Sequence, residues 1–128
     1  MSIVVVQLGS KRLPNEGLRL GTVRRPPRGV HKKDFARQNW YDLWLPLLSP
    51  SPATIKLAKQ AAGDADWKRF ARKYRTEMGR AEPSMVIDLL AALSHQTSFS
   101  VGCYCPDEAH CHRSVLRELL KEHGAKVE

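Results

Sequence analysis

The segment from Ile3 to Leu8 constrains the fold more than any other part of the chain. Its residues are mostly β-branched and apolar, and they do not alternate with polar residues. A continuous run of this kind is typical of a strand that is covered on both faces, as in a parallel or mixed sheet. A second short strand is predicted over residues 18–23, where apolar residues alternate with Arg19 and Gly21, and a third over residues 99–105.

Helix signals separate and follow these strands. Ser51 before Pro52 is a typical helix start, and Gly79 and Gly124 are typical helix ends. The third predicted helix is apolar around most of its circumference, which indicates a central position in the packing. The last helix is expected to carry Arg113 on its outer face. We predict helices near residues 52–62, 67–78, 85–95 and 112–123.

The order of strand, loop, helices, strand and helix is typical of an α/β protein. We predict a single α/β domain over residues 1–128, with a short, mostly parallel sheet flanked by about five helices. We find no internal repeat and no composition change that would indicate a domain boundary.

The composition excludes several classes of protein. A chain of 128 residues with 42% hydrophobic residues can bury a core without disulfide bonds. No apolar run approaches the roughly 20 residues that a membrane helix needs, so we expect no membrane partner. The three cysteines lie close together, from Cys103 to Cys111, whereas a secreted disulfide framework uses an even number spread along the chain. Since the first residues also lack the features of a signal peptide, we expect a cytoplasmic protein.

Positive charge is concentrated in one part of the sequence. The net charge is +8, and the segment from Lys11 to Arg37 holds nine lysines and arginines against two acids. In open α/β sheets, ligands bind beyond the carboxyl ends of the strands. Two predicted loops leave strands in this way, over residues 24–29 and 106–112, and the first lies inside the basic segment. This arrangement favours an anionic partner.

Several motifs resemble those of the domain of unknown function 488 family of small prokaryotic proteins. They occur in the family's order and extend from Leu18 to Ala125. The motifs are Arg24–Val30, Tyr41–Pro46 with Ser49–Ser51, Trp67–Phe70 with Tyr74 and Arg75, Cys103–Cys105, and Cys111–Leu116.

The resemblance implies a cytoplasmic prokaryotic α/β domain without an established activity. It transfers the family's loop arginines to Arg24 and Arg28, and the family's Cys-His-Arg motif to Cys111, His112 and Arg113. Many relatives have Asn where Cys111 stands, so a reaction that requires this thiol is not a property of the whole family. Whether the protein is an enzyme is left open.

We predict an anion-binding site between the Arg24–Gly29 loop and the Cys105–Arg113 loop. Cations at the start of a helix oppose its dipole, and a bound anion would reverse this cost. The ligand would be a nucleotide or a phosphate-bearing metabolite. Its binding residues would be Arg24, Arg28, Cys111, His112 and Arg113.

Alternatives exist for each of these residues. Arg113 could pair with Asp107 or Glu108, and Cys111 could be a buried, inert thiol. Cys103 and Cys105, together with Cys111 and a neighbouring histidine, could form a zinc set. However, Cys-x-Cys is not the usual zinc-knuckle spacing, so we predict no metal and no cofactor.

Two other classes of function remain open at this point. The basic face from Lys68 to Arg75, together with the aromatic residues near Trp40, could bind nucleic acid without catalysis. The chain could also be a small protein-interaction module. The sequence gives neither the oligomeric state nor the partner of the Tyr41–Pro46 segment.

Overall fold

A four-stranded parallel sheet forms the centre of the protein. The computed structural model describes all residues from Met1 to Glu128. The strands lie in the order β1-β4-β2-β3, and each neighbouring pair is parallel. This arrangement confirms the predicted α/β class and parallel sheet. The strands are β1 (Ile3–Gln7), β2 (Leu18–Gly21), β3 (Leu43–Trp44) and β4 (Phe99–Cys103).

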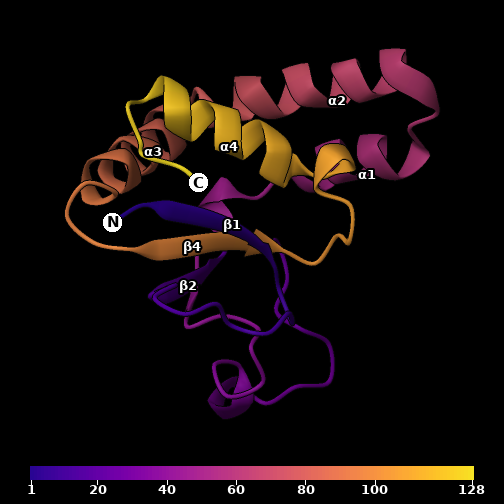
Figure 1. The fold of residues 1–128 in the computed structure, drawn as a ribbon. Coiled ribbons are helices and arrows are strands. Elements are labelled where there is room, and N and C mark those ends of the chain that lie inside the picture. The colour runs from indigo at the N-terminus through magenta and orange to yellow at the C-terminus, as the bar shows by residue number, and fades with distance from the viewer.

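Four α-helices accompany the sheet, and three short 3-10 turns lie in the connecting segments. The prediction of about five helices is therefore one too high. All four helices lie on the same side of the sheet (Figure 1). Their bounds are α1 (Pro52–Gln60), α2 (Gly63–Met78), α3 (Ala81–Leu93) and α4 (His112–Glu122).

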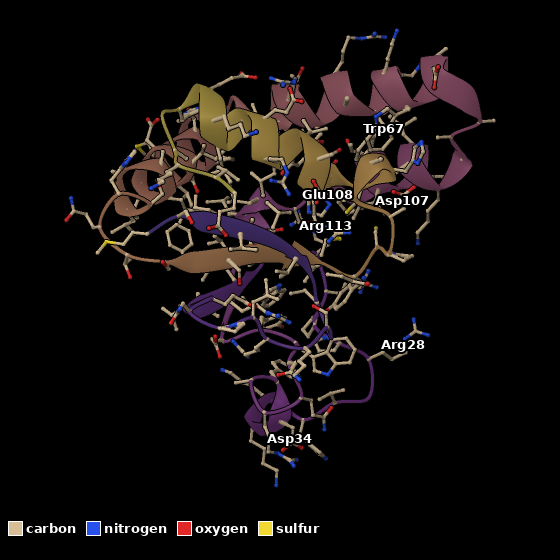
Figure 2. The ribbon with its side chains drawn as sticks, in the orientation of Figure 1. Arg28, Asp34, Trp67, Asp107, Glu108 and Arg113 are labelled. Carbon is tan, nitrogen blue, oxygen red and sulfur yellow. The ribbon has the colours of Figure 1, made fainter.

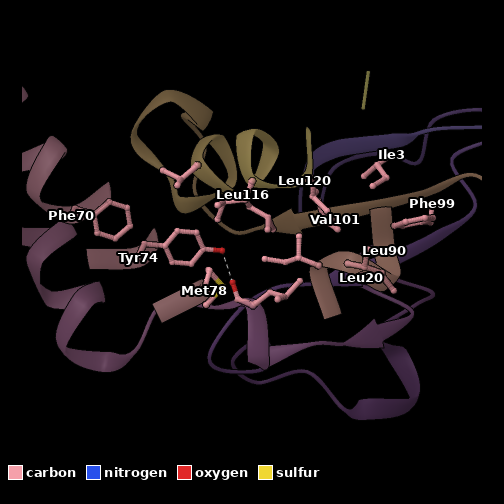
Figure 3. Close-up of a cluster of buried hydrophobic side chains, with 14 residues drawn as sticks. Ile3, Leu20, Phe70, Tyr74, Met78, Leu90, Phe99, Val101, Leu116 and Leu120 are labelled. Carbon is pink, nitrogen blue, oxygen red and sulfur yellow. Dashed lines mark hydrogen bonds between the residues drawn. The ribbon is translucent and has the colours of Figure 1, made fainter. Parts of the chain in front are cut away.

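The main hydrophobic core lies between the sheet and the helices (Figure 3). Alternate residues of the strands enter it, among them Leu20 of β2 and Val101 of β4. The buried Tyr74 of α2 donates a hydrogen bond of 2.7 Å to the carbonyl oxygen of Leu48, which anchors that helix to the segment after β3. Burial of these apolar side chains is the main stabilising contribution to the fold.

The opposite face of the sheet is covered by loops instead of helices. Arg19 of β2 is fully buried there and forms an ion pair of 2.7 Å with Glu16. Its guanidinium also donates to the carbonyl oxygens of Ser10 and Asn39, while Ser100 of β4 donates to Glu16. This network covers β2 and β4, whereas β1, the strand that was expected to be covered on both faces, lies at the edge of the sheet and leaves Val4 and Val5 half-buried.

The third helix is not central to the packing, which corrects the prediction from its composition. Met85, Leu89 and Leu93 of α3 have 63%, 56% and 38% of their surface exposed. Since they are spaced four residues apart, these side chains form one stripe along the helix. The stripe is exposed because no other part of the chain covers it. None of the four helices has both the length and the apolar character needed to cross a membrane.

Candidate functional site

A second, smaller cluster of buried side chains lies at the carboxyl ends of the strands. Gly21 of β2 pairs with Gly102 of β4, so the residues that follow them, Thr22 and Cys103, lie side by side. The chain then turns through Pro106 to His110 and enters α4, whose N-cap residue is Cys111. The cluster contains Leu8, Val23, Tyr41, Cys103 and Cys111.

All three cysteines meet in this cluster, and all three are free. The Sγ atoms of Cys103 and Cys105 are 3.8 Å apart. The ligand atoms of Cys103, Cys111 and His112 all lie within 4.8 Å of one another, and all three residues are buried. Hydrogen bonds with the other two thiols lower the pKa of the Cys105 thiol, against the effect of burial, and the Arg113 charge lowers it further. Cys105 therefore ionises before Cys103, whose pKa its neighbours raise.

His112 is held in a defined orientation at the first position of α4. Its Nε2 atom lies 2.8 Å from the carbonyl oxygen of Thr22, and the ring packs edge-on against Tyr74. Since a carbonyl oxygen only accepts hydrogen bonds, Nε2 carries the proton. The other ring nitrogen, Nδ1, lies 3.9 Å from the Cys111 sulfur. In the neutral ring, Nδ1 therefore has its lone pair on the side of the thiols.

Arg113 is buried beside this cluster, which corrects the prediction that it lies on the outer face of the last helix. Only 3% of its surface is exposed, and its Nη2 atom donates a 2.7 Å hydrogen bond to the carbonyl oxygen of Cys105. Its Nε atom is buried without a hydrogen-bond partner. The loop from Cys105 to His110 covers this first turn of α4, which is why helical periodicity alone misplaces the side chain.

The two acids near the start of α4 pair with other residues. Asp107 accepts a hydrogen bond from His110 at 2.8 Å, and Glu108 forms an ion pair of 2.8 Å with Arg117. Arg113 forms an ion pair with neither of them. The alternative in which Arg113 pairs directly with Asp107 or Glu108 is therefore wrong. Hydrogen bonds with His110 and Arg117 lower the pKa of these two carboxyl groups, and the Arg113 charge lowers it further.

The predicted site residues fall into two groups. Cys111, His112 and Arg113 are adjacent and buried. Arg24 turns away from them, and its guanidinium donates to the carbonyl oxygens of Ser49 and Pro50. Arg28 is exposed on the outside of its loop, whereas Arg113 lies between α4 and the sheet (Figure 2).

The residue just before the second predicted loop touches the first loop. Tyr104, which follows β4, donates a 2.9 Å hydrogen bond from its hydroxyl group to the carbonyl oxygen of Arg25. The Tyr104 ring also packs edge-on against Trp40. This contact is thus made by an aromatic side chain and a backbone carbonyl, and no arginine of one loop contacts the other loop's motif.

Arg24 lines a cavity of about 330 Å³ that the sequence did not indicate. The cavity lies where the segment after β3 meets the end of α2 and the start of α3. Arg80, the N-cap residue of α3, makes no capping hydrogen bond with its side chain. The polar and charged residues of the lining are Arg24, Ser49, Ser51, Glu77, Arg80 and Glu82.

Glu77 is a buried residue that lines this cavity. Its carboxylate accepts hydrogen bonds from the backbone and hydroxyl of Ser51 and from the hydroxyl of Thr54. Burial raises the pKa of Glu77, but these hydrogen bonds outweigh burial and bring the pKa below its ordinary value. Glu77 is therefore ionised at neutral pH, and the cavity contains charges of both signs.

A second hollow lies over α1 and α2. This groove has a volume of about 500 Å³ and is lined by Leu57, Arg69, Arg72, Lys73 and Thr76. Its three basic residues are exposed, and they belong to the predicted basic helix face. Arg75 of the same helix is not part of it, because it pairs with Glu122 of α4 at 2.9 Å.

Sequence reasoning missed Arg80 and Glu77, which lie near the end of α2 and have no motif of their own. The one available signal was the spacing of Ser51 and Thr54, which are typical helix-capping residues that can also bind a carboxylate. The sequence-based prediction also omitted Cys103 and Cys105 from the site residues, although alternation along the predicted strand placed both on one face.

Comparison with known proteins gives a family but no activity. A family model described as the Active DUF488-N3 subclade matches residues 3–124, a range that includes every strand and helix given above. No curated protein and no solved structure matches the chain. The match confirms the resemblance indicated by the arginine loop and the closing cysteine motifs. The protein thus belongs to the Active DUF488-N3 subclade, a group within the domain of unknown function 488 family.

Proposed function

We propose that the protein binds a small phosphate-bearing metabolite or nucleotide in the cavity next to Arg24. The observation that carries this proposal is the position of the Arg24 side chain. It is half-buried on the cavity wall, and its Nη1 atom makes no hydrogen bond within the protein. A guanidinium presents several donors in one plane, and phosphate and carboxylate oxygens are its best partners.

The other lining groups support the same ligand class. Arg80 supplies a second cation, and the first N–H groups of α3 have no side-chain cap. Backbone N–H groups at a helix start favour an anion. Glu82 and the walls around Ser49 add acceptors, which would suit hydroxyl or amino groups on the same ligand. A sugar phosphate or a nucleotide combines both features, whereas a bare anion does not.

Arg24 is shared with the site predicted from the sequence, but the cavity lies away from the start of α4. Arg28 is an exposed residue in the same loop and has no ion-pair partner, so it provides a matched control. The predicted ligand class stays the same.

The proposal can be tested by thermal-shift screening of the purified protein against nucleotides and sugar phosphates. A ligand at 100 times its Kd adds about 2.7 kcal/mol of stability. For a domain of this size we expect Tm to rise by roughly 10 °C.

Three variants identify the site. For a ligand found in the screen, R80A should weaken binding about 3- to 10-fold and R24K should weaken it more, because Lys cannot present a planar pair of donors. R28A should bind like the wild type. Equal binding by R24K, R80A and the wild type would contradict the proposed pocket.

A second candidate function is nucleic-acid binding at the groove over α1 and α2. The observation that favours it is the exposed set of three basic residues, Arg69, Arg72 and Lys73, with no acid in the lining. Such a surface would contact phosphates without reading sequence. Affinity for a mixed-sequence oligonucleotide should then fall steeply with salt, and R72E should lower it far more than R80A does. An oligonucleotide affinity that does not change with salt and is the same for R72E and R80A would exclude this candidate.

A further inference from the structure

We infer that Cys103, Cys105, Cys111 and His112 bind a zinc ion or a similar soft divalent cation. This inference is independent of the proposed ligand cavity, since no residue is shared between the two. It also reverses our expectation from the sequence, which included no metal. Thiolates and imidazole are the ligands that zinc prefers, and a Cys₃His set is a known composition of structural zinc sites.

Two of the separations between donor atoms are close to those of tetrahedral zinc, and the set formed by Cys103, Cys111 and His112 extends to 4.8 Å and would contract around an ion. With Zn–S bonds of about 2.3 Å, two sulfurs on one zinc ion lie about 3.8 Å apart. The Sγ atoms of Cys103 and Cys105 are separated by 3.8 Å. The nitrogen and sulfur of a His and a Cys ligand would lie about 3.5 Å apart. The Nδ1 atom of His112 lies 3.9 Å from the Cys111 sulfur, so only a small adjustment is needed.

The hydrogen bond of His112 is the one that a metal-bound histidine requires. A histidine ligand usually donates its other ring N–H to a carbonyl or carboxylate oxygen, which fixes the tautomer and the ring orientation. The Nε2 atom of His112 has this partner, the carbonyl oxygen of Thr22 at 2.8 Å. His110, two residues earlier, also has such a partner in Asp107, but it is exposed and is not one of the clustered donor residues.

The charge around the cluster supports the same conclusion. A zinc ion with three thiolates and one neutral imidazole has a net charge of −1. Arg113 is buried beside the cluster, bonds to the carbonyl oxygen of Cys105, and forms no ion pair. Its charge acts at longer range on Asp107 and Glu108. Burial of a guanidinium without a directly paired carboxylate is unfavourable. The metal-thiolate group would supply a negative charge next to the same turn of chain.

The burial of the cluster indicates what the metal would do. Cys103, Cys111 and His112 are each at most 6% exposed. Four protein ligands leave no open position for a water or a substrate, which is the pattern of a structural site. The ion would join the end of β4 to the start of α4 and, through Thr22, to the end of β2.

A disulfide between two of the cysteines is the competing state of the same cluster. It would use two thiols, leave the third free, and supply no negative charge for Arg113. The two states differ in mass and in thiol count, so a single preparation distinguishes them.

The experiment measures the metal content and the intact mass of the full-length protein, purified without chelator, in the absence of oxygen and without added reductant. We expect about one zinc ion per chain by elemental mass spectrometry. After metal removal, addition of CoCl₂ should produce the intense absorption of tetrahedral cobalt bound to thiolates. Chelation should lower Tm by several degrees, and added ZnCl₂ should restore it.

Matched variants assign the ligands. C105S changes the most exposed of the three thiols and should lower zinc affinity at least 100-fold, and H112A should have a similar effect. H110A alters the neighbouring exposed histidine and should retain the metal. If C105S does not fold, the metal content and cobalt spectrum of the wild type still decide the question. Wild-type protein that has no zinc and gives no cobalt spectrum, or a mass lower by two hydrogens, would overturn the inference.

Discussion

Two buried arginines show how differently the fold can accommodate the same charge. Arg19 lies on the loop-covered face of the sheet, and its guanidinium is satisfied by Glu16 and by two backbone carbonyl oxygens. Arg113 lies at the start of α4, with one hydrogen bond to Cys105 and an unpartnered Nε atom. Arg19 belongs to a complete structural network. Arg113 has no ion pair and only one hydrogen bond, and it lies beside the thiols and imidazole of the proposed metal centre.

The largest expected effect comes from breaking the complete network. The variant R19M leaves Glu16 buried without its partner, and a broken buried ion pair costs about 3–5 kcal/mol. Urea unfolding should show this loss equally with and without chelator. R37M, which removes an exposed arginine paired with Asp34, is the control and should leave stability nearly unchanged. A small effect of R19M would contradict the stabilising role assigned to the network of Arg19 and Glu16.

The pH dependence of stability tests the network around Arg19 in a second way. Burial raises the pKa of Glu16, but hydrogen bonds from Arg19 and Ser100 outweigh it and lower the pKa from 4.5 to about 2. Because the folded-state pKa is lower than the unfolded one, this contribution is present above pH 4.5. It is lost as the pH falls toward about 2. Acid unfolding of the E16Q variant should lack this component, and identical profiles for both proteins would contradict the assignment.

For Arg113, the proposed metal centre predicts an effect on stability that depends on bound metal. With zinc bound, R113M should destabilise the protein by about 1–3 kcal/mol, because the thiolate group loses its neighbouring cation. After chelation, the difference from the wild type should shrink or change sign, since removal of an unpaired buried charge is often stabilising. Thermal melts of both proteins in each state measure this. The same shift with and without metal would place Arg113 in the same class as Arg19.

The smallest effect belongs to an arginine on the same helix that is partly exposed. Arg117 pairs with Glu108 through two hydrogen bonds, but both side chains reach solvent. R117A should cost about 0.5 kcal/mol at low salt, and 1 M salt should remove most of the difference. A larger, salt-independent loss in denaturant titrations would indicate that the loop over Arg113 depends on this pair.

The sequence predicted the parts of the fold that depend on local patterns. The strand beginning at Ile3, the strand beginning at Phe99 and the helix starting after Cys111 follow from runs of β-branched residues and from helical periodicity, although the second strand ends at Cys103 and not at Cys105 as predicted. The order of these elements predicted a mostly parallel sheet. What local patterns could not predict is that the helices occupy one face only, because a loop network around Arg19 replaces them on the other.

The candidate site was predicted only in part, for the same reason. Alternation placed Cys103 and Cys105 on one face, but the 3-10 turn at Glu108–His110 that returns Cys111 to them depends on tertiary packing. Periodicity grouped Arg113 with the outer face of its helix, although the preceding loop covers it. Arg24 was predicted to bind an anion beside the start of α4, but it lines a cavity elsewhere, whose other arginine, Arg80, lies more than fifty positions away and has no sequence signal.

The central claim is that the thiols and the imidazole beside Arg113 form a metal-thiolate group. X-ray absorption at the zinc edge of the protein as purified tests it most directly. The account predicts a first shell of three sulfurs at about 2.3 Å and one nitrogen at about 2.0 Å. The H110A variant should give the same spectrum, and C105S should lose a sulfur or the metal itself. A first shell of oxygens, or zinc that is lost on simple dialysis, would contradict the account.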